Sequence, residues 1–544
     1  MLRKSKWFIL FTIFLLFLAA CSNKTDKPAS NKPAEETKDG EQASSGEPKR
    51  GGTLQLLNPA DPDMLDPHRT SSIYAHSIVG LVYSKLVTYE TGPNVDYSDY
   101  NIVPDLAEKW EISDDGKVYT FHLRENAKWH DVPPVNGRNV TSEDVVATFE
   151  RIQTLPGHQA YMLDQIEKVD TPDDLTVVIT LKEPFAPFLS YMANHFMWIL
   201  PKEAAEGKIN LENTAIGTGP FILEKWERDV ETTFVRNPNY FLEGLPYLDG
   251  ISMKVVPDED TRLAAFRTGQ TDTTGIISPQ QFQNLIKANP DLPYNETLFA
   301  TQTQVYMNMT KKPFDDLKVR KAISLAIDRQ NAVDQIFGGG EISGPVNPSL
   351  GNWALSKEER EKLQPYDVEQ AKKLLAEAGY PDGFDTKVMV TDGYGEATVR
   401  LAQWIVEDLR KIGINAELEV VEYATYFSQK WPKLDYDIGV GYQTYLQEPD
   451  EWLYGQLHSK GAKNWFGINL PELDKMLEEQ RRILDENERL QKVHDIQRYA
   501  LENVVNPIPL TTHITRSPIQ PYLKNWYTHA SYGSIHMKEV WLDK

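Results

Sequence analysis

The chain has 544 residues, too many for one ordinary hydrophobic core, and its 40% apolar and 25% charged residues are typical of soluble globular proteins. A formal net charge of −22 disfavours nucleic-acid binding, because an acidic surface repels phosphate groups. Cys21 is the only cysteine, which excludes an intramolecular disulfide and a zinc site built from cysteines.

The first 20 residues have the pattern of an export signal. Three basic residues within positions 3–6 precede an apolar run, 7–18, that is too short for a comfortable membrane span. The run ends in Leu18-Ala19-Ala20-Cys21, which resembles a bacterial lipobox. We therefore expect residues 1–20 to be removed and Cys21 to carry lipid. The alternative is an uncleaved membrane anchor with an incidental cysteine.

Residues 21–50 are expected to form a flexible tether. They are rich in Lys, Glu, Ser, Pro, Ala and Gly and contain almost no apolar side chains. Such a segment cannot bury enough surface to fold by itself. The folded body should then lie at the extracellular face of the membrane, as in lipoproteins of Gram-positive bacteria, or in the periplasm if the cell has an outer membrane.

Strands are predicted in the first half of the body. Short runs of alternating or β-branched residues, some bounded by turn signals, indicate them. They cover residues 51–57, 118–123, 175–181, 232–235 and 251–256.

Helices are predicted mainly in the second half. A helical period over 316–337 stops at Gly338, and Asp367 with Gln370 forms a capping box before a helix over 371–378. Gly379 is then expected just beyond the end of that helix. Further helices are predicted over 397–412, 471–484 and 486–502. Strands mixed with helices indicate layered α/β architecture.

Motifs for catalysis are absent from the sequence. It contains no Gly-x-Ser-x-Gly, no Gly-x-x-x-x-Gly-Lys and no His-Glu-x-x-His. We expect His122 and His130 to pack in a strand or loop rather than to bind a metal. The chain is therefore not expected to be an enzyme or to need a cofactor. A surface peptidase is the alternative from another class, and an adhesin or sensor is a third.

Many ordered motifs resemble the peptide/nickel family of ABC-transporter solute-binding proteins, which includes oligopeptide- and dipeptide-binding proteins. The resemblance runs from Gly51 to near the C-terminus. Its motifs are Leu65-Asp66-Pro67-His68, Val103 to Trp110, Ser113 to Arg124, Trp129-His130-Asp131, Ser142 to Val146, Gly217 to Phe221, Arg236 to Tyr240, Pro246 to Gly250, Val319 to Ile323, Ala326 to Arg329 and Ala371 to Tyr380.

The resemblance implies a three-lobed α/β fold of the periplasmic-binding-protein kind, which closes on its ligand about a hinge. Lobe I would comprise residues 51–83, 206–300 and 509–544. Lobe II would comprise 84–205 and lobe III 301–508. An oligopeptide would lie extended between lobes, pairing with the backbone of Ser71-Ser72-Ile73 and of Gly439 to Tyr445.

The candidate ligand residues follow from this alignment. They are Ser71, Ser72, Ile73, Tyr161, Gly439, Gly441, Tyr442, Gln443, Tyr445, Glu448, Asp450 and Trp452. Many relatives hold the peptide's amino group with an aspartate at the position of Tyr445, and a tyrosine supplies no counter-charge. Glu448 or Asp450 is expected to supply it, or the amino terminus is not anchored.

Two ligand classes stay open at this point. Tyr442, Tyr445 and Trp452 could stack on sugar rings, so an oligosaccharide is the alternative to an oligopeptide, while core packing is the other interpretation of Trp452. The expected partners are the ligand, the permease subunits of an ABC importer and the membrane, and the protein is expected to be a monomer without nucleic acid.

Overall fold

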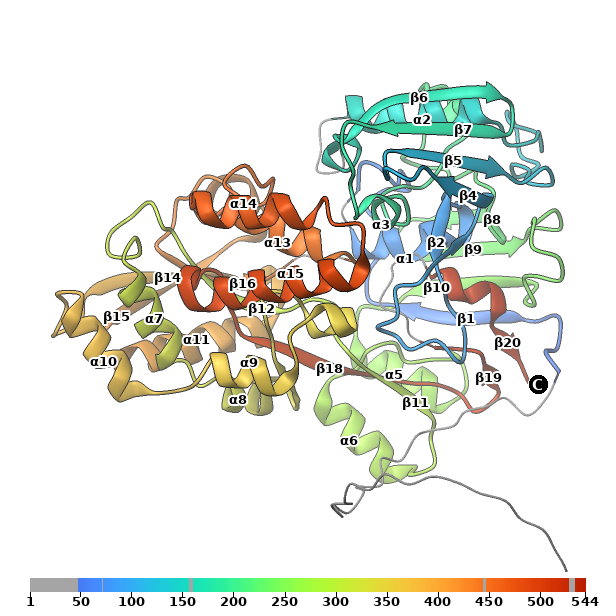
Figure 1. Ribbon diagram of the computed structural model, residues 1–544. Coiled ribbons are helices and arrows are strands. Elements are labelled where there is room, and N and C mark those ends of the chain that lie inside the picture. Colours follow the sequence, from blue (N-terminus) through green and yellow to red (C-terminus); the bar gives the residue numbers. More distant parts are fainter. Residues whose placement is uncertain (1–46, 71, 156–159, 444–446, 528–533) are drawn as a thin grey trace, which may run out of the picture. The chain divides into compact units, whose positions relative to one another are not determined.

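The computed structural model describes residues 47–70, 72–155, 160–443, 447–527 and 534–544. They belong to one unit, Ser44–Lys544, in which sheets and helices alternate along the chain (Figure 1). None of the helices in these ranges combines the length and the apolar composition that a membrane span requires.

A four-stranded sheet pairs the start of the body with residues much later in the chain. Its order is β1-β10-β9-β8. β1 (Thr53–Asn58) runs parallel to β10 (Gly250–Val255), and β9 (Glu231–Arg236) pairs antiparallel with β10 and with β8 (Phe221–Glu227). Leu54 and Leu56 alternate with more exposed residues and enter the core, as the sequence pattern requires.

A second four-stranded sheet is formed by residues between 107 and 181. Its order is β4-β5-β7-β6, all antiparallel, with β4 (Ala107–Ile112), β5 (Val118–Leu123), β6 (Ile166–Asp173) and β7 (Thr176–Leu181). Alternate residues of β5 and β7 are buried, so one face of the sheet meets the core. Helix α2 (Ser142–Thr154) lies beside it (Figure 1) and begins with a capping box of Thr141 and Asp144.

A five-stranded sheet organises residues 303–509 in three layers. Its order is β15-β14-β16-β12-β17. The strands are β12 (Thr303–Met307), β14 (Asp385–Thr391), β15 (Asn415–Val421), β16 (Ile438–Tyr442) and β17 (Ile508–Pro509).

Helices cover both faces of this sheet. Val305, Val388 and Val440 pack with α7 (Leu317–Ala326), α10 (Val368–Glu377) and α11 (Glu396–Arg410). Tyr306 and Met389, which point to the opposite face, pack with α13 (Pro449–Leu457), α14 (Pro471–Gln480) and α15 (Glu486–Tyr499). The sheet is therefore buried between two helical layers.

Two antiparallel chain segments connect this layered region with the rest of the unit. β11 (Tyr294–Leu298) pairs with β18 (Thr511–Pro518), which also pairs with β13 (Gly340–Ile342). β11 leads into β12, and β17 leads into β18. Figure 1 shows β11 and β18 side by side, running from the five-stranded sheet toward β1.

The remaining elements are short. They are α1 (Ile73–Val82), β2 (Val87–Tyr89), β3 (Ile102–Pro104), η1 (Ala160–Leu163), α3 (Phe188–Met192), α4 (Lys202–Ala205), α5 (Glu259–Arg267), α6 (Pro279–Ala288), α8 (Arg329–Ala332), η2 (Val333–Phe337), η3 (Pro348–Trp353), α9 (Lys357–Leu363), η4 (Asp392–Tyr394), α12 (Tyr423–Thr425), η5 (Tyr426–Lys430), η6 (Ala500–Val504), β19 (Leu523–Lys524), η7 (Ile535–Glu539) and β20 (Trp541–Leu542).

The helix expected over 316–337 is interrupted. Ile327 is extended, and Asp328 starts the next helix by accepting a hydrogen bond from Asn331 N. A short side chain that caps a helix competes with helix continuation, which explains the break. The stop at Gly338 is confirmed by its φ of 69°. Asp367 caps α10 as expected, and α14 ends at Gln480 rather than at 484.

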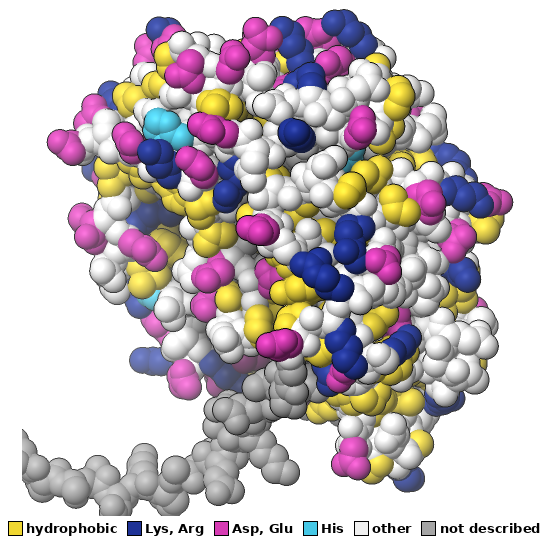
Figure 2. Space-filling model, turned by 90° about the vertical axis from the view of Figure 1, so that its right-hand side faces the viewer, with side chains coloured by type: hydrophobic (Ala, Val, Ile, Leu, Met, Phe, Trp, Pro, Cys, Tyr) yellow, Lys and Arg dark blue, Asp and Glu magenta, His cyan; other side chains and the backbone are white. Residues whose placement is uncertain are grey.

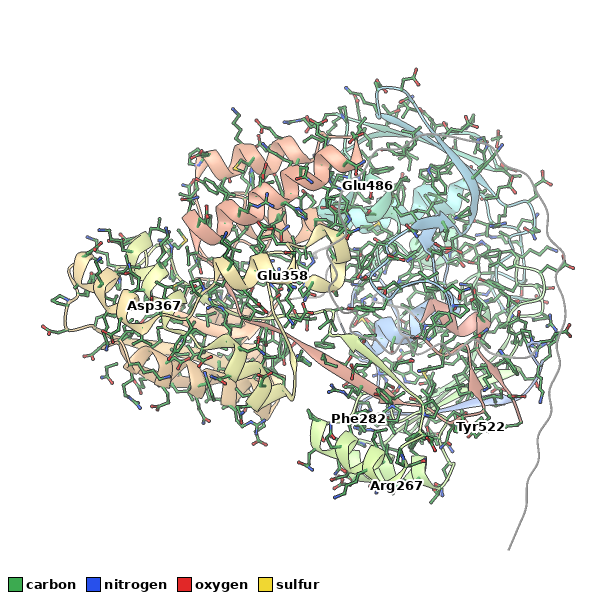
Figure 3. All side chains as sticks on the ribbon, turned by 60° about the horizontal axis from the view of Figure 1, so that its bottom comes forward. Arg267, Phe282, Glu358, Asp367, Glu486 and Tyr522 are labelled. Atoms are coloured by element: carbon green, nitrogen blue, oxygen red, sulfur yellow. The ribbon has the colours of Figure 1, made fainter. Side chains whose placement is uncertain are left out.

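Acidic residues mark several helix starts. Figure 3 labels Glu358, Asp367 and Glu486, which lie at the N-terminal ends of α9, α10 and α15. Negative charge there is favoured by the helix dipole. Figure 2 shows acidic and basic side chains interspersed over the face that it presents.

Candidate functional site

Three buried carboxylates lie at the start of α13. Glu448 is its N-cap, and Asp450 and Glu451 occupy its first turn. Acidic residues at a helix start are normally solvated, but the exposed fractions of these residues are 3%, 0% and 2%. Buried carboxylates need charged or hydrogen-bonding partners, and some of these partners come from residues about 260–290 positions away.

Glu448 and Asp450 are each paired within the interior. Arg489 on α15 pairs with Glu448. Asp450 Oδ2 lies 3.2 Å from Arg481 Nε and accepts a hydrogen bond of 2.7 Å from Tyr191 Oη, while Gln480 donates to Oδ1. Tyr191 is on α3, so Asp450 joins two distant parts of the chain. Both carboxylates are occupied by protein groups in this structure.

Glu451 is held from both sides of the same junction. Tyr161 Oη donates to Oε1 at 2.9 Å, Asn194 Nδ2 lies 3.3 Å from both oxygens, and Gln447 N donates to Oε2 at 3.2 Å. Burial raises the pKa of Glu451 to about 7, although the positive charge of Lys463 opposes the shift. The carboxyl group therefore titrates near neutral pH.

Gly439 and Gly441 make room for tyrosine rings of this chain. A Cβ at Gly439 would lie 2.2 Å from the ring of Tyr306, and one at Gly441 would lie 2.7 Å from Tyr426 Oη. Both rings are fully buried. On that face of β16 the two glycines therefore allow the tyrosine rings to pack inside the protein. This role in packing was not expected from the sequence.

One edge of β16 is open at Tyr442. β12 pairs with β16 as far as Tyr442, but the register with β14 ends at Gly439. Gln443 N donates to Gln302 O beside β12. Along a strand, the N–H and C=O groups of successive residues point to opposite edges. Since those of Gln443 point toward β12, the N–H and C=O of Tyr442 point toward the other edge, where the pairing with β14 has already ended.

Rings surround this open edge. The centroid of Tyr394 lies 5.3 Å from that of Tyr442, 5.8 Å from that of Tyr423 and 6.1 Å from that of Phe427. Tyr423 is 46% exposed. A ligand at the edge would meet flat side chains, a common lining of binding sites.

The structure separates those expected ligand residues that it describes into four groups. Gly439, Gly441, Tyr442 and Gln443 lie on or directly after β16, and Tyr161, Glu448 and Asp450 lie at the junction around α13. Ser72 is the N-cap of α1 and Ile73 its first residue, so this segment starts a helix rather than forming a strand or loop. Trp452 is 1% exposed and belongs to the core, as the packing interpretation holds. Ser71, Tyr445 and Cys21 lie outside the described residues.

Sequence reasoning missed Glu451, Tyr191, Asn194 and Lys463. Glu451 resembles any acidic residue in a helix's first turn, and Lys463 lies in a polar loop. The signal available in the sequence was the run Glu448-Pro449-Asp450-Glu451. It holds three acidic residues at a helix start marked by proline, more than capping of the helix requires.

Buried histidines are present without a metal cluster. Burial lowers the pKa of His130 to about 4, and its Nε2 lies 3.1 Å from Gly219 O. The rings of His76 and His195 meet edge to face at 4.9 Å. Within the described ranges, no group of three or more His, Cys, Asp or Glu residues could hold a metal ion.

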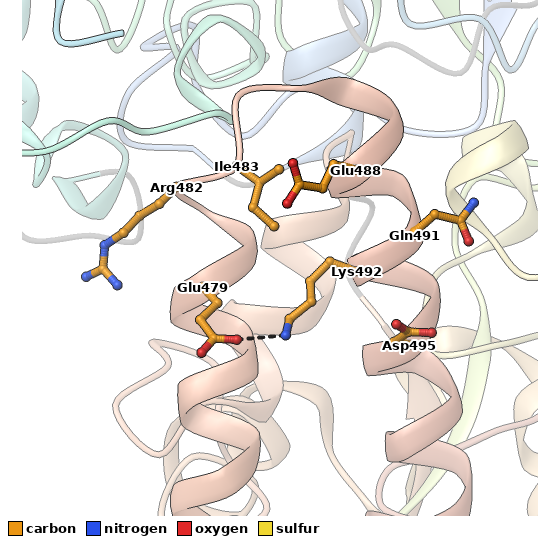
Figure 4. A pocket seen from close by; sticks show the side chains of 7 residues that line it. All are labelled: Glu479, Arg482, Ile483, Glu488, Gln491, Lys492 and Asp495. Atoms are coloured by element: carbon orange, nitrogen blue, oxygen red, sulfur yellow. Dashed lines mark hydrogen bonds and ion pairs between the residues drawn. The ribbon is translucent and has the colours of Figure 1, made fainter. Parts of the chain in front are cut away.

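An open hollow of about 540 Å³ lies elsewhere, between α14 and α15 (Figure 4). A salt bridge of 2.7 Å between Glu479 and Lys492 crosses it. None of the expected ligand residues contributes to it. Its lining consists of Glu479, Arg482, Ile483, Glu488, Gln491, Lys492 and Asp495. Charged, exposed side chains dominate, so we assign the hollow to the surface relief of the two helices.

Comparison with known families gives one family model. The model of bacterial extracellular solute-binding proteins, family 5 (middle part), matches residues 101–464. A heme-binding protein A from Haemophilus influenzae is 29% identical over 481 residues, which cover 83% of this chain and 85% of that protein. A dipeptide-binding protein from Escherichia coli is 27% identical over 81% of this chain and 85% of its own length. A glutathione-binding protein from Salmonella paratyphi A is 32% identical over 66% and 67%.

Solved structures share the fold. The periplasmic binding protein DppA from Helicobacter pylori, in complex with the peptide STSA, is 26% identical with a TM-score of 0.76 over 91% of this chain and 99% of that one. AgaA from A. tumefaciens R10, in complex with agropinic acid, gives the same identity, TM-score and coverage. The mixed α/β fold expected from the sequence is thereby confirmed.

Proposed function

Because this chain belongs to the bacterial extracellular solute-binding proteins of family 5, we propose that it captures an oligopeptide outside the cell and delivers it to an ABC importer. Binding and release would be its whole activity, without a catalytic step. The relatives named for dipeptides and glutathione, and the neighbour solved with the peptide STSA, support a peptide ligand.

The open edge of β16 at Tyr442 is the observation that carries the proposal. An extended peptide can continue a sheet at such an edge, because every peptide offers the same N–H and C=O groups. Main-chain pairing gives affinity without demanding one side-chain sequence. The rings of Tyr394, Tyr423 and Phe427 would then border the first side chains of the ligand.

An oligosaccharide is the second candidate. The same rings could stack on sugar faces, and the half-exposed Tyr423 supports this alternative. The relatives named for haem and for agropinic acid indicate that the fold accommodates ligands other than peptides. The peptide has the better support, because stacking alone does not use the backbone groups of Tyr442.

Closure would bring the α13 junction together. We propose that β11 and β18 act as the hinge, since in the described part of the chain these two neighbouring segments and their continuations lead into the five-stranded sheet. Arg482 pairs with Glu183 at 2.7 Å, Tyr161 with Glu451, and Tyr191 with Asp450 across the closing surfaces. Lobes I to III keep the boundaries given above as part of the proposal. These boundaries separate the three large sheets, except that the one after residue 508 divides β17 (Ile508–Pro509).

Attachment to the membrane is also proposed. Lipid on Cys21 would hold the protein at the extracellular face, with residues 21–50 as a tether that lets the body reach the permease. We propose that it acts as a monomer without a cofactor. Metabolic labelling with a radioactive or clickable fatty acid, compared with the Cys21→Ser variant, tests the lipid.

Native mass spectrometry of the protein purified from its own cells tests the ligand class. Recovery of peptides supports the proposal, and recovery of oligosaccharides alone overturns it. Incubation with the recovered ligand separates binding from hydrolysis: a binding protein returns the peptides uncut, whereas fragments would indicate a peptidase.

A further inference from the structure

Of the three buried carboxylates at the α13 junction, Glu451 alone has no cationic partner among the described residues. Arg489 pairs with Glu448. Arg481 Nε lies 3.2 Å from Asp450. Within the described part of the chain, no lysine, arginine or histidine forms an ion pair with Glu451, although it is only 2% exposed. Its burial therefore costs more free energy when it is ionised than when it is neutral.

Uncharged groups surround the Glu451 carboxyl instead. Tyr161 Oη lies 2.9 Å from Oε1, and Asn194 Nδ2 lies 3.3 Å from both oxygens. Gln447 N lies 3.2 Å from Oε2. Tyr161 and Asn194 come from the other side of the proposed closing surface, 290 and 257 positions earlier in the chain. Separation of the two surfaces would remove both side chains and admit water to the carboxyl.

We propose that Glu451 takes up a proton from water when the α13 junction closes and returns it to water when the junction opens, which couples ligand capture to pH. In the open form the solvated carboxyl ionises as an ordinary glutamate does. In the closed form the neutral carboxyl is favoured, because no cation replaces the lost water. This coupling rests on the proposed function, since it requires hinge closure, but it applies to any class of ligand.

The direction of the pH dependence follows from the two environments of Glu451. Burial raises its pKa in this structure from the usual 4.5 to about 7. A carboxyl whose pKa is higher in the closed form favours closure at low pH, and this preference is lost as pH rises from about 4.5 through 7. The ratio of closed to open molecules should therefore fall about tenfold between pH 6 and 8. A ligand that binds the closed form loses affinity by the same factor.

Other titratable groups at the junction act differently. Those that interact with Glu451 are Tyr89, Tyr161, Tyr191, Glu448 and Lys463. Burial raises the pKa of the three tyrosines well above 10, so they stay neutral between pH 5 and 8. Glu448 and its partner Arg489 lie on the same side of the closing surface, so opening leaves this pair intact.

The cationic groups have the opposite sign. Burial lowers the pKa of Lys463 and of His195, which follows Asn194 in the chain. If opening exposed either group, it would bind a proton more readily in the open form, so low pH would favour opening. The sign of the pH dependence thus distinguishes Glu451 from both.

Single-molecule fluorescence energy transfer tests the coupling without any ligand. The full chain with Cys21→Ser carries dyes at Lys168→Cys on β6 and Lys475→Cys on α14, two exposed positions on opposite sides of the closing surface. The closed-to-open ratio is measured from pH 5 to 8. Glu451→Gln imitates the neutral carboxyl. Glu369→Gln, at an exposed acid in the first turn of α10, is the matched control.

We expect the ratio in the dye-labelled protein to fall about tenfold from pH 6 to 8. Glu451→Gln should hold its ratio constant over this range, and Glu369→Gln should follow the unsubstituted protein. A ratio that rises with pH, or that changes equally with and without Glu451→Gln, overturns the proposal. If Glu451→Gln does not fold, the sign in the unsubstituted protein decides.

The outcome is separable from that of the proposed function. A mixture of open and closed molecules whose ratio is independent of pH overturns proton uptake and leaves peptide capture intact. Proton uptake together with the recovery of oligosaccharides alone retains the coupling and overturns the peptide. One unchanging population at every pH counts against hinge closure and against proton uptake.

Discussion

Tyr161 donates a hydrogen bond of 2.9 Å to Glu451, which lies 290 positions later in the sequence. Thirty positions after Tyr161, Tyr191 reaches Asp450 next to Glu451 in the same way, at 2.7 Å. Two phenols from one part of the chain therefore meet two successive carboxylates at the first turn of one helix. These contacts contain no ligand atoms, so in the proposed hinge closure they would favour the closed arrangement independently of the ligand's side chains.

Tyr161→Phe should weaken ligand binding. The substitution removes the hydroxyl but keeps the ring, so the closed form loses one hydrogen bond to a carboxylate. Such bonds contribute about 1.5–3 kcal/mol, which corresponds to a loss of affinity of about tenfold or more. Titration calorimetry with the recovered ligand measures it. Tyr366→Phe, at a 44% exposed tyrosine outside β11, β18 and α13, is the control. Equal affinities for the two variants would contradict the role of this contact in closure.

Glu451→Gln should change how stability depends on pH. The folded-state pKa of Glu451 is about 7, above the usual value for glutamate. A raised carboxyl pKa means that the folded state loses stability as pH rises from about 4.5 through 7. The free energies of unfolding of wild type and variant should be similar at pH 5. By pH 8 the variant should be about 3 kcal/mol more stable than wild type.

Chemical denaturation of both proteins across this range measures that difference, and the buried histidines common to both cancel in the comparison. The groups that face Glu451 are Tyr161, Asn194, Gln447, Glu448 and Lys463. If the difference in unfolding free energy between the two proteins does not vary from pH 5 to 8, Glu451 is ionised in the folded state over that whole range.

Local pattern predicted most of the elements. The alternation of Val118 to Leu123 predicts a strand, and Gly338 predicts the end of a helix. Both signals span only a few residues and act through local backbone geometry. The interruption at Ile327 was missed because the apolar period continues across it. Only the cap formed by Asp328 reveals the break, and an aspartate in a helix pattern is too common to signal one.

The site was predicted only in its sequence-local part. Tyr442 and its neighbours were found through the alignment of one strand. Glu451 was missed because its burial depends on Tyr161 and Asn194, which no short-range pattern connects with it. The role of Gly441 was likewise hidden, since it depends on where Tyr426 folds back.

Gly439→Ala and Gly455→Ala should have opposite effects. A Cβ at Gly439 would strike the buried ring of Tyr306, and overpacking of this kind typically costs about 1–3 kcal/mol. Gly455 lies within α13 with open space at its Cβ position. Alanine there should add roughly 0.5–1 kcal/mol by favouring the helix. Urea denaturation compares the two, and stabilisation by both would contradict the packing at β16.

Arg489→Met should destabilise the fold strongly. It would leave Glu448, which is 3% exposed, without its charged partner. Removing one member of a buried pair costs about 3–5 kcal/mol. Arg410→Met breaks an exposed pair with Glu407 and should cost below about 1 kcal/mol. Similar losses for the two variants would indicate that Glu448 becomes hydrated or protonated when Arg489 is absent.

Tyr442→Pro and Tyr442→Ala separate the backbone of β16 from its side chain. Both variants remove the ring that meets Tyr394. Only proline also removes the N–H at the edge that β14 leaves open, and Gly441 before it tolerates the restriction that proline imposes. Because this N–H faces away from β12, its loss should not disturb the sheet itself.

If a peptide pairs here, proline should lower its affinity about fivefold beyond the alanine variant. If the ligand only stacks on rings, as a sugar would, the two variants should bind alike. Titration of both with the recovered ligand therefore decides between main-chain pairing and stacking at the same residue.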